Sequence, residues 1–265
     1  MRPLAALTAA DVAGLRGVVF DLDDTVLDRG ALTEAAFRAL FRLREVGLSL
    51  VACTGRPAGW GEVIQRQWPL AATVVENGAL AFVTAAAGRV VASSASGGAA
   101  SVRRAELVAL AQRLCELHSE VALADDNDAR RTDVTLDVGE HRHAPPAVVA
   151  ALRAACVGAG VRTVVSSVHM HLSFGGFDKA SGTLRVLAEH MGEDVAAARG
   201  AWAFVGDSGN DAAAFAAFRT TFAVANVAAH LGALTVPPRF VAGATMGEGF
   251  AQIAARICAC RREIV

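Results

Sequence analysis

The sequence repeats one local pattern, in which a short apolar run ends in small or acidic residues and a longer helical stretch follows. Val18–Phe20 leads directly into Asp21, and Ala201–Val205 leads into Gly206 and Asp207. Such alternation is typical of βα units around a parallel sheet. In open α/β sheets, ligands bind beyond the carboxyl ends of the strands. We therefore expect these polar clusters to meet at one edge of a mainly parallel sheet.

The middle of the chain departs from this pattern. From about Ala81 onward, short strand-like segments alternate with two helical stretches, residues 102–118 and 147–157. We interpret this part as an inserted α+β domain that ends at Gly175 and Gly176, because paired glycines permit a hinge. The predicted domains are a core of residues 1–81 and 177–265 and an insertion of residues 82–176, with a surface loop at residues 93–101.

Charge and composition exclude several classes of protein. The 25 basic and 26 acidic residues nearly balance, whereas a protein that binds nucleic acid mainly through phosphate contacts needs a strong basic excess. No apolar run reaches the roughly 18 residues that a membrane helix requires. The N-terminus shows no secretory signal pattern, and five scattered cysteines favour a reducing compartment over a disulfide framework. We expect a cytoplasmic protein with no nucleic-acid partner and no membrane partner.

Two acidic clusters carry the strongest chemical signal. Asp21, Asp23 and Asp24 follow the first strand, and carboxylates this close repel one another unless a cation or a reaction uses them. Asp207 and Asp211 lie in a turn after another strand, and their oxygen ligands suit Mg²⁺. An acidic turn that caps the next helix is the alternative explanation for either cluster alone. Two such clusters at one sheet edge favour a shared site.

Lys179 is the only lysine of the chain. A compact ammonium group and a planar guanidinium group are not equivalent at a tight anionic site. We therefore take Lys179 as a candidate functional residue, with chance retention of a lysine as the alternative.

Four segments, in this order, resemble the four motifs of the haloacid dehalogenase superfamily. They are Asp21-Leu22-Asp23-Asp24-Thr25, Thr54-Gly55-Arg56, Lys179 and Gly206-Asp207-Ser208-Gly209-Asn210-Asp211. The resemblance implies that Asp21 is the nucleophile that forms an aspartyl-phosphate. It implies that Asp23 is the acid/base group, and that Thr54 and Lys179 hold the transferring phosphoryl group. The Mg²⁺ ligands that it implies are Asp21, the backbone carbonyl of Asp23, and Asp207, with Asp211 in support.

The place of the insertion selects a branch of the superfamily. The interval between Asp21 and Thr54 holds only a turn, a helix and a strand, whereas the interval between Thr54 and Lys179 leaves room for a domain. This arrangement resembles class IIB, which has a C2B-type cap and includes sucrose-phosphate, trehalose-phosphate and mannosyl-3-phosphoglycerate phosphatases. The resemblance implies an α/β fold, with a Rossmann-like α/β/α core and an inserted α+β cap. The substrate-binding residues that it implies are Thr54, Gly55, Arg56, Asn77, Lys179 and Asn210.

The predicted function is Mg²⁺-dependent hydrolysis of a small phosphorylated metabolite, such as a sugar phosphate or a phosphoglycerate-linked sugar. Phosphoryl transfer spreads negative charge over oxygens, so a metal ion and Lys179 would offset the repulsion between Asp21 and the phosphate. Two alternatives remain open, a phosphomutase of the same superfamily and a sensor that binds a sugar phosphate without turning it over. We expect a monomer or a homodimer whose partner is a small phosphorylated substrate.

Some features of the insertion keep alternative interpretations. The His-x-His pairs in residues 141–143 and 169–171 have ligand types that zinc accepts, although strand histidines that face water or a sugar are commoner. Arg130 and Arg131 suit a second anionic group of the substrate, with a solvated charged loop as the alternative. Trp60 is expected in ordinary core packing rather than in a cleft.

Overall fold

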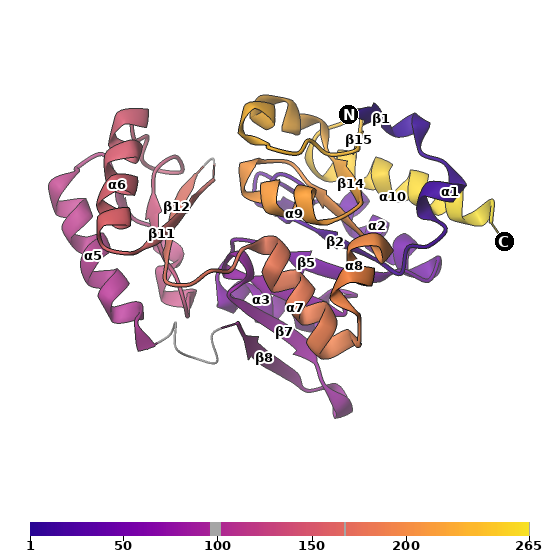
Figure 1. Cartoon of the computed structure of the whole chain (residues 1–265), viewed down its shortest axis with the longest axis horizontal. Coiled ribbons are helices and arrows are strands. Elements are labelled where there is room, and N and C mark those ends of the chain that lie inside the picture. The colour runs from indigo at the N-terminus through magenta and orange to yellow at the C-terminus, as the bar shows by residue number, and fades with distance from the viewer. Residues whose placement is uncertain (96–101, 167, 265) are drawn as a thin grey trace.

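The computed structural model of the chain describes residues 1–95, 102–166 and 168–264. Its elements form two units, a large one that contains both termini and a smaller one at the left of Figure 1. Most of the loop predicted at residues 93–101 lies outside the described residues. No helix in the described ranges is both long and apolar enough to span a membrane.

A nine-stranded sheet forms the centre of the large unit. In spatial order its strands are β1 (Arg2–Pro3), β15 (Phe240–Val241), β14 (Thr220–Ala223), β13 (Trp202–Gly206), β2 (Gly17–Phe20), β5 (Ser49–Cys53), β6 (Ala72–Val75), β7 (Leu80–Thr84) and β8 (Val90–Ser94). The pairs from β1 to β6 are parallel, and β7 and β8 add an antiparallel edge. Phe20 of β2 pairs with Val205 of β13, so the strands that precede Asp21 and Asp207 end side by side.

Helices cover both faces of this sheet because its central strands are apolar on both sides. Val18 and Phe20 belong to one buried cluster, and Val19 belongs to the other. The first cluster includes side chains of α1 (Ala9–Val12), α2 (Glu34–Glu45), α3 (Ala58–Gln67) and α10 (Met246–Arg262), and the second includes those of α7 (Lys179–Met191), α8 (Val195–Ala201) and α9 (Ala212–Ala217). These layers confirm the predicted α/β/α fold.

Short elements join the larger ones. They are the 3₁₀ helices η1 (Leu4–Ala6), η2 (Glu76–Gly78), η3 (Ala86–Gly88), η4 (Asp125–Ala129), η5 (Gly209–Asp211) and η6 (Ala225–Ala233), and the hairpin of β3 (Leu27–Asp28) with β4 (Ala31–Leu32). Several of them follow strands of the large sheet, so they shape the edge at which the acidic clusters lie.

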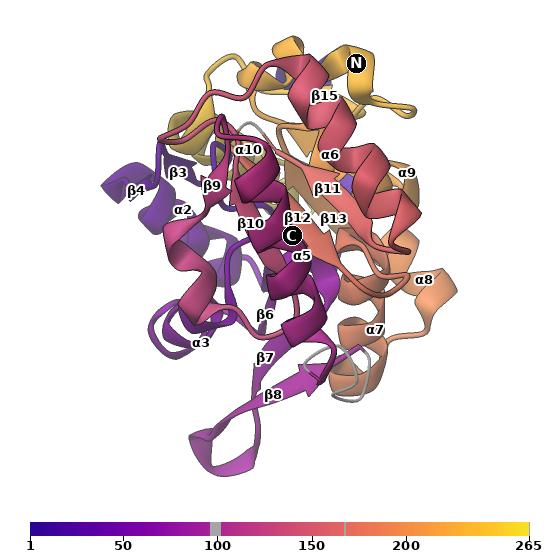
Figure 2. The same cartoon turned by 90° about the vertical axis from the view of Figure 1, so that its left-hand side faces the viewer.

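The smaller unit, called here the four-stranded unit, contains an antiparallel sheet and two helices. Its strands, in spatial order, are β11 (Arg162–Val165), β12 (His169–Ser173), β10 (Val134–Asp137) and β9 (Ala122–Leu123), and its helices are α5 (Arg104–Leu117) and α6 (Pro146–Gly158). Leu136 and Met170 pack with both helices, which lie in front of the sheet in Figure 2. Because side chains alternate along strands, Thr135 and its partner His171 lie on the opposite face.

The pairing of β8 shifts the border between the two units relative to the sequence prediction. The predicted insertion starts at residue 82, but β7 and β8 form a hairpin that extends the nine-stranded sheet to Ser94. The hairpin pairs Leu80 with Ser94 and Thr84 with Val90. Val90 and Val91 belong to the short strand-like segments that the sequence analysis placed in the insertion, and the pairing of β8 with β7 assigns them to the large sheet.

A close backbone contact fixes the start of α7. Asp178 caps this helix by accepting a hydrogen bond from the Ser181 amide at 2.8 Å, so the first helical residue is Lys179. Gly78 has a φ of +103°, and a Cβ there would lie 2.1 Å from the Asp178 carbonyl oxygen. A Cβ at Gly182 would lie 2.3 Å from the Gly78 Cα. Two glycines therefore allow η2 and α7 to touch.

Replacing Gly182 by Ala is expected to destabilise the protein, because the new methyl group meets backbone atoms of Gly78. Overpacking typically costs about 1–3 kcal/mol, so Gly182→Ala should lower the free energy of unfolding in urea by at least about 1 kcal/mol. The control is Gly158→Ala at the end of α6, where an added Cβ meets nothing within 4 Å. Equal unfolding free energies for the two variants would contradict this packing.

Candidate active site

A cavity of about 490 Å³ lies between the two units. Its walls come from the carboxyl ends of the parallel strands on one side and from the polar side of the four-stranded unit on the other. The residues that matter most for its chemistry are Asp21, Asp23 and Asp207 of the large unit and Glu140, His169 and His171 of the four-stranded unit. The sheet edge predicted from the sequence thus borders a cavity.

A buried lysine joins two of the predicted carboxylates. The Lys179 Nζ lies 2.8 Å from Asp21 Oδ1 and 2.8 Å from Asp211 Oδ1. All three side chains are almost fully buried. Asp21 follows β2, Lys179 begins α7 and Asp211 ends η5, so three separate segments contribute to one ion-pair group.

Asp211 and Asp207 are held by complementary hydrogen bonds. Asp211 Oδ2 accepts the amides of Asp207 at 2.9 Å and Ser208 at 3.2 Å. Asp207 Oδ1 accepts the Thr25 hydroxyl at 3.1 Å, and Oδ2 accepts the Asn226 side-chain amide at 2.8 Å. The role of Asn226 was missed by the sequence analysis. Its position in η6, which follows a strand that ends at the same sheet edge, was the available signal.

Burial and charge both perturb ionisation in this group. Burial raises the pKa of Asp21 well above its ordinary value, and the nearby Asp211 and Asp207 carboxylates add to the rise although Lys179 opposes it. Burial, followed by the Asp211 carboxylate, raises the pKa of Asp207 to about 7. Burial alone would lower the pKa of Lys179, but the charges of Asp21 and Asp211 raise it above its ordinary value. The lysine therefore stays charged among carboxylates that lack full compensation.

The donor set fits a divalent cation. One carboxylate oxygen from each of Asp21, Asp207 and Asp211 lies within 4.8 Å of the others. Three ionised carboxylates and one ammonium leave two uncompensated negative charges, which a divalent ion cancels. Oxygen-only ligands suit Mg²⁺. Because Asp211 already binds Lys179 and two amides, Asp21 and Asp207 are the side chains better placed to hold the ion, with Asp211 in support.

Asp23 lies beside Arg56 at the cavity wall. The Arg56 Nε donates to both carboxylate oxygens of Asp23 at 3.0 Å, and Nη2 donates to Oδ1 at 2.6 Å. The Arg56 guanidinium lies 4.0 Å from the ring centroid of Trp60. Trp60 itself is 44% exposed and lines the cavity, so the core position favoured for it by the sequence analysis is wrong. Its ring instead supports the arginine that holds Asp23.

The other predicted site residues lie at different depths. Thr54 is buried, and its Oγ1 accepts the Arg56 amide at 3.1 Å. Asn77 is 6% exposed, and neither polar atom of its side-chain amide has a hydrogen-bond partner among the described residues. Gly55 and Asn210 line the cavity. A Cβ on Gly55 would lie 3.2 Å from the Asn77 Oδ1, so Asn77 lies next to a residue of the cavity wall. Its side chain is an unpaired buried amide at this place.

Glu76 connects the two units, and the sequence analysis missed this role. Its carboxylate accepts the amides of Arg131 at 2.9 Å, Thr132 at 2.7 Å and Asp133 at 3.3 Å, together with the Thr132 hydroxyl. It also accepts the amide of Ala58 at the start of α3, at 3.0 Å. Burial raises the pKa of Glu76, and the Asp133 carboxylate adds to this rise. Glu76 belongs to the segment Glu76-Asn77-Gly78, but its partners are 55 to 57 positions away, so no local signal reveals them.

The arginines and histidines of the four-stranded unit contact acidic and backbone groups of both units. Arg130 is 4% exposed and donates to Asp126, Asp133 and the Gly55 carbonyl. Arg131 points elsewhere, with its guanidinium 3.6 Å from Glu62. In the described part of the chain, the grouping of possible metal ligands consists of carboxylates alone, so the two His-x-His pairs do not assemble a zinc site there.

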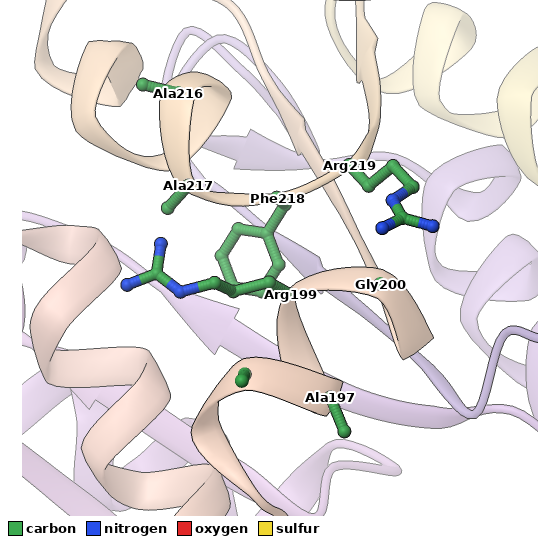
Figure 3. Close-up of a pocket in the computed structure, with 8 residues that line it drawn as sticks. Ala197, Arg199, Gly200, Ala216, Ala217, Phe218 and Arg219 are labelled. Atoms are coloured by element: carbon green, nitrogen blue, oxygen red, sulfur yellow. The ribbon is translucent and has the colours of Figure 1, made fainter.

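A second hollow, of about 520 Å³, lies between α8 and α9. Figure 3 shows that alanines, Phe218 and the arginines Arg199 and Arg219 surround it. It contains no carboxylate and none of the predicted site residues. The chemistry predicted from the sequence belongs to the cavity between the units.

Residues 18–129 match the family model of haloacid dehalogenase-like hydrolases. This match assigns residues 18–129 to the haloacid dehalogenase-like hydrolases. The matched range contains the first two motifs, and the fold places Lys179 and Asp207 beside them. The insertion between Thr54 and Lys179 agrees with the class IIB arrangement predicted from motif spacing. The chain matches none of the curated proteins.

Solved structures share this haloacid dehalogenase fold at low sequence identity. A protein from Thermoplasma acidophilum is 18% identical, with a TM-score of 0.71 over 92% of this chain and 98% of the other. The sucrose-phosphatase of Synechocystis, solved with sucrose and phosphate, is 17% identical, with a TM-score of 0.65 and the same coverage. A trehalose-6-phosphate phosphatase related protein is also 17% identical, with a TM-score of 0.62 over 94% of this chain and all of the other.

The raised pKa of Asp207 predicts a pH dependence of stability in the metal-free protein. Native Asp207, with its pKa near 7, holds a proton that the unfolded chain releases near 3.8, so stability falls as the pH rises between these values. Bound Mg²⁺ stabilises the ionised form and should raise the melting temperature more at pH 8 than at pH 5. Calorimetry with EDTA or Mg²⁺ measures both effects.

The variant Asp207→Asn isolates this contribution because it cannot titrate. Its melting temperature should fall less between pH 4 and 7 than that of the unchanged protein, and Mg²⁺ should shift it less. Asp194→Asn is the matched control, since Asn replaces Asp as a helix cap at the exposed start of α8. Parallel pH profiles for the unchanged protein and Asp207→Asn would contradict the assignment.

Replacing Glu76 by Gln is expected to loosen the contact between the two units. The side-chain NH₂ of Gln faces amide donors, so at least one of the hydrogen bonds to residues 131–133 is lost. Small-angle X-ray scattering should show a larger radius of gyration for Glu76→Gln. Glu34→Gln on α2 is the control, because Glu34 pairs with Arg38 of the same helix and so lies within one unit. A radius equal to that of the control would contradict the role given to Glu76.

Proposed function

We propose that this protein is a Mg²⁺-dependent phosphomonoesterase that acts on a small phosphorylated metabolite, such as a sugar phosphate. One observation carries the proposal: Lys179 joins Asp21 to Asp211 beside Asp207 at the wall of a cavity. A nucleophilic carboxylate next to a buried ammonium and a divalent-ion donor set suits the attack of one anion on another.

In this proposal Asp21 attacks the phosphorus atom of the substrate. The new bond joins Asp21 to phosphorus as the bond to the leaving oxygen breaks, and Asp23 gives that oxygen a proton. Asp23 then takes a proton from water as the water oxygen attacks phosphorus, which releases inorganic phosphate and restores Asp21. Both carboxylates line the same cavity, which supports this division of roles.

The surrounding residues position the charges. Lys179 keeps Asp21 in place and offsets part of the negative charge that the phosphoryl group brings. Thr25 and Asn226 orient Asp207, and Arg56 orients Asp23. A bound Mg²⁺, held by Asp21, Asp207 and the backbone carbonyl of Asp23, supplies the remaining positive charge near the phosphate oxygens. Thr54, Gly55 and Asn210 are proposed to contact the phosphoryl group, and Asn77 is proposed as a further substrate-binding residue.

The four-stranded unit is proposed to act as the cap. It forms the far wall of the cavity, so it separates the reacting atoms from bulk water when it rests on the large unit. Sugar phosphates are the proposed substrate class because structures that share the fold include a sucrose-phosphatase with bound sucrose and phosphate. The cytoplasmic location and the monomeric or homodimeric state remain predictions.

The proposal is tested by the variant Asp21→Asn, assayed for phosphate release from p-nitrophenyl phosphate and sugar phosphates with Mg²⁺. Loss of the nucleophile should lower kcat by at least about a thousandfold. Asp194→Asn, remote from the cavity, is the control and should keep the activity. Undiminished turnover by Asp21→Asn contradicts the covalent mechanism, and an isomerised sugar phosphate in place of released phosphate identifies a mutase.

A further inference from the structure

We propose that the cavity selects phosphomonoesters whose leaving group is rich in hydrogen-bond donors and is neutral or positively charged, and that it excludes those with a second anionic group. The inference rests on the proposed function, since it concerns the half of the cavity formed by the four-stranded unit. Glu140, His169 and His171 line the cavity on this side, opposite Asp21.

Arg130, the arginine that sequence reasoning offered for a second anion, is already fully engaged. Its Nε and Nη2 donate to Asp126 at 2.8 and 2.6 Å, and its Nη1 lies 3.0 Å from both Asp133 Oδ2 and the Gly55 carbonyl oxygen. The side chain is buried, so an incoming anion must break these contacts to reach it. The Arg131 guanidinium faces Glu62 and does not line the cavity.

His171 presents a hydrogen-bond acceptor to the cavity. Its Nδ1 lies 3.0 Å from Asp133 Oδ2, closer than to the Thr135 hydroxyl at 3.4 Å and the Arg130 Nη1 at 3.5 Å, so we assign the proton to Nδ1, which donates to the carboxylate. Burial lowers the pKa of His171, so the ring is neutral. Its Nε2 has no hydrogen-bond partner among the described residues, and the ring lines the cavity. A neutral Nε2 accepts from a hydroxyl or an ammonium group and cannot donate to an anion.

Carboxylates make up most of the remaining charged groups of this wall, and the Ser166 hydroxyl donates to the His169 carbonyl. Glu140 pairs with His169, whose Nε2 lies 2.8 Å from Oε2, and the Glu140 side chain is 43% exposed. Asp125 and Asp126 line the cavity as well. Asp125, Asp126, Asp133 and Glu140 carry four negative charges, and Arg130 carries one positive charge. The net charge of this wall therefore stays negative even when His169 is protonated.

The arginines of the opposite wall do not change this conclusion. The Arg56 guanidinium is hydrogen-bonded to Asp23. Arg29 supplies Asp24 with a backbone hydrogen bond and a nearby positive charge, and both favour the ionised form of that carboxyl group. Both arginines lie on the large unit, on the side of Asp21, where the phosphoryl group binds in the proposed function. A second anion on the leaving group therefore meets carboxylates. Charges of like sign this close repel one another, which disfavours such a substrate.

A matched series of sugar 6-phosphates tests the inference. Glucose 6-phosphate has only hydroxyl groups beside its phosphate and its C1 aldehyde, glucosamine 6-phosphate has an ammonium group in place of one hydroxyl, and 6-phosphogluconate has a carboxylate in place of the aldehyde. With Mg²⁺, kcat/KM for phosphate release should be at least about tenfold lower for 6-phosphogluconate than for glucose 6-phosphate, and highest for glucosamine 6-phosphate. Added salt should narrow these differences.

The variant Glu140→Gln tests the wall itself. Removal of one carboxylate should reduce the ratio of kcat/KM between glucosamine 6-phosphate and 6-phosphogluconate several-fold, whereas the control Glu120→Gln, exposed in the same unit, should leave the ratio unchanged. An unchanged ratio in Glu140→Gln overturns the role of Glu140.

The assay with p-nitrophenyl phosphate separates failure of this inference from failure of the proposed function. No hydrolysis of any probe with Mg²⁺ removes the phosphatase proposal. Hydrolysis of p-nitrophenyl phosphate together with equal or better turnover of 6-phosphogluconate overturns the selectivity while the phosphatase proposal stands. Hydrolysis of p-nitrophenyl phosphate with no turnover of any of the three sugar phosphates also overturns the proposed selectivity.

Discussion

The ion-pair group around Lys179 is the interaction on which the site depends. Three carboxylates buried together at a sheet edge repel one another, and burial disfavours each charge further. The ammonium of Lys179 compensates one of them and leaves a deficit that matches a divalent cation. The Lys179 Nζ lies 2.8 Å from each of two buried carboxylate oxygens. The guanidinium group of an arginine is larger and planar, so it does not fit this space as the ammonium group does. This gives a physical reason for a single lysine in an arginine-rich chain.

The position of that lysine follows from backbone packing rather than from its own interactions. Asp178 starts the helix at Lys179, and the contact between Gly78 and Gly182 sets how closely this helix approaches the sheet edge. Asp21 arrives from the neighbouring strand, so the ion pair forms only when both packing conditions are met. A small steric change at a glycine thus acts on the electrostatics of the site.

The second unit contributes a different kind of constraint. Glu76 gathers backbone amides from the segment after η4, and Arg130 donates to the Gly55 carbonyl, so each unit supplies charge to the backbone of the other. Such buried charge-assisted bonds hold a defined relative position. The same contacts use up the positive charge of Arg130, which leaves an acceptor-rich wall over the cavity. Positioning and selectivity therefore arise from one network.

The sequence alone determined the α/β fold, the acidic strand ends and the order of the four motifs, because these depend on local periodicity and on short segments. It also singled out Lys179, since composition made it exceptional. Tertiary structure alone decided that β8 extends the large sheet, that Glu76 joins the units, that Trp60 lines the cavity and that Arg130 is engaged internally. These outcomes depend on partners distant in the chain, and hydrogen bonds between distant segments leave no periodic trace in a single sequence.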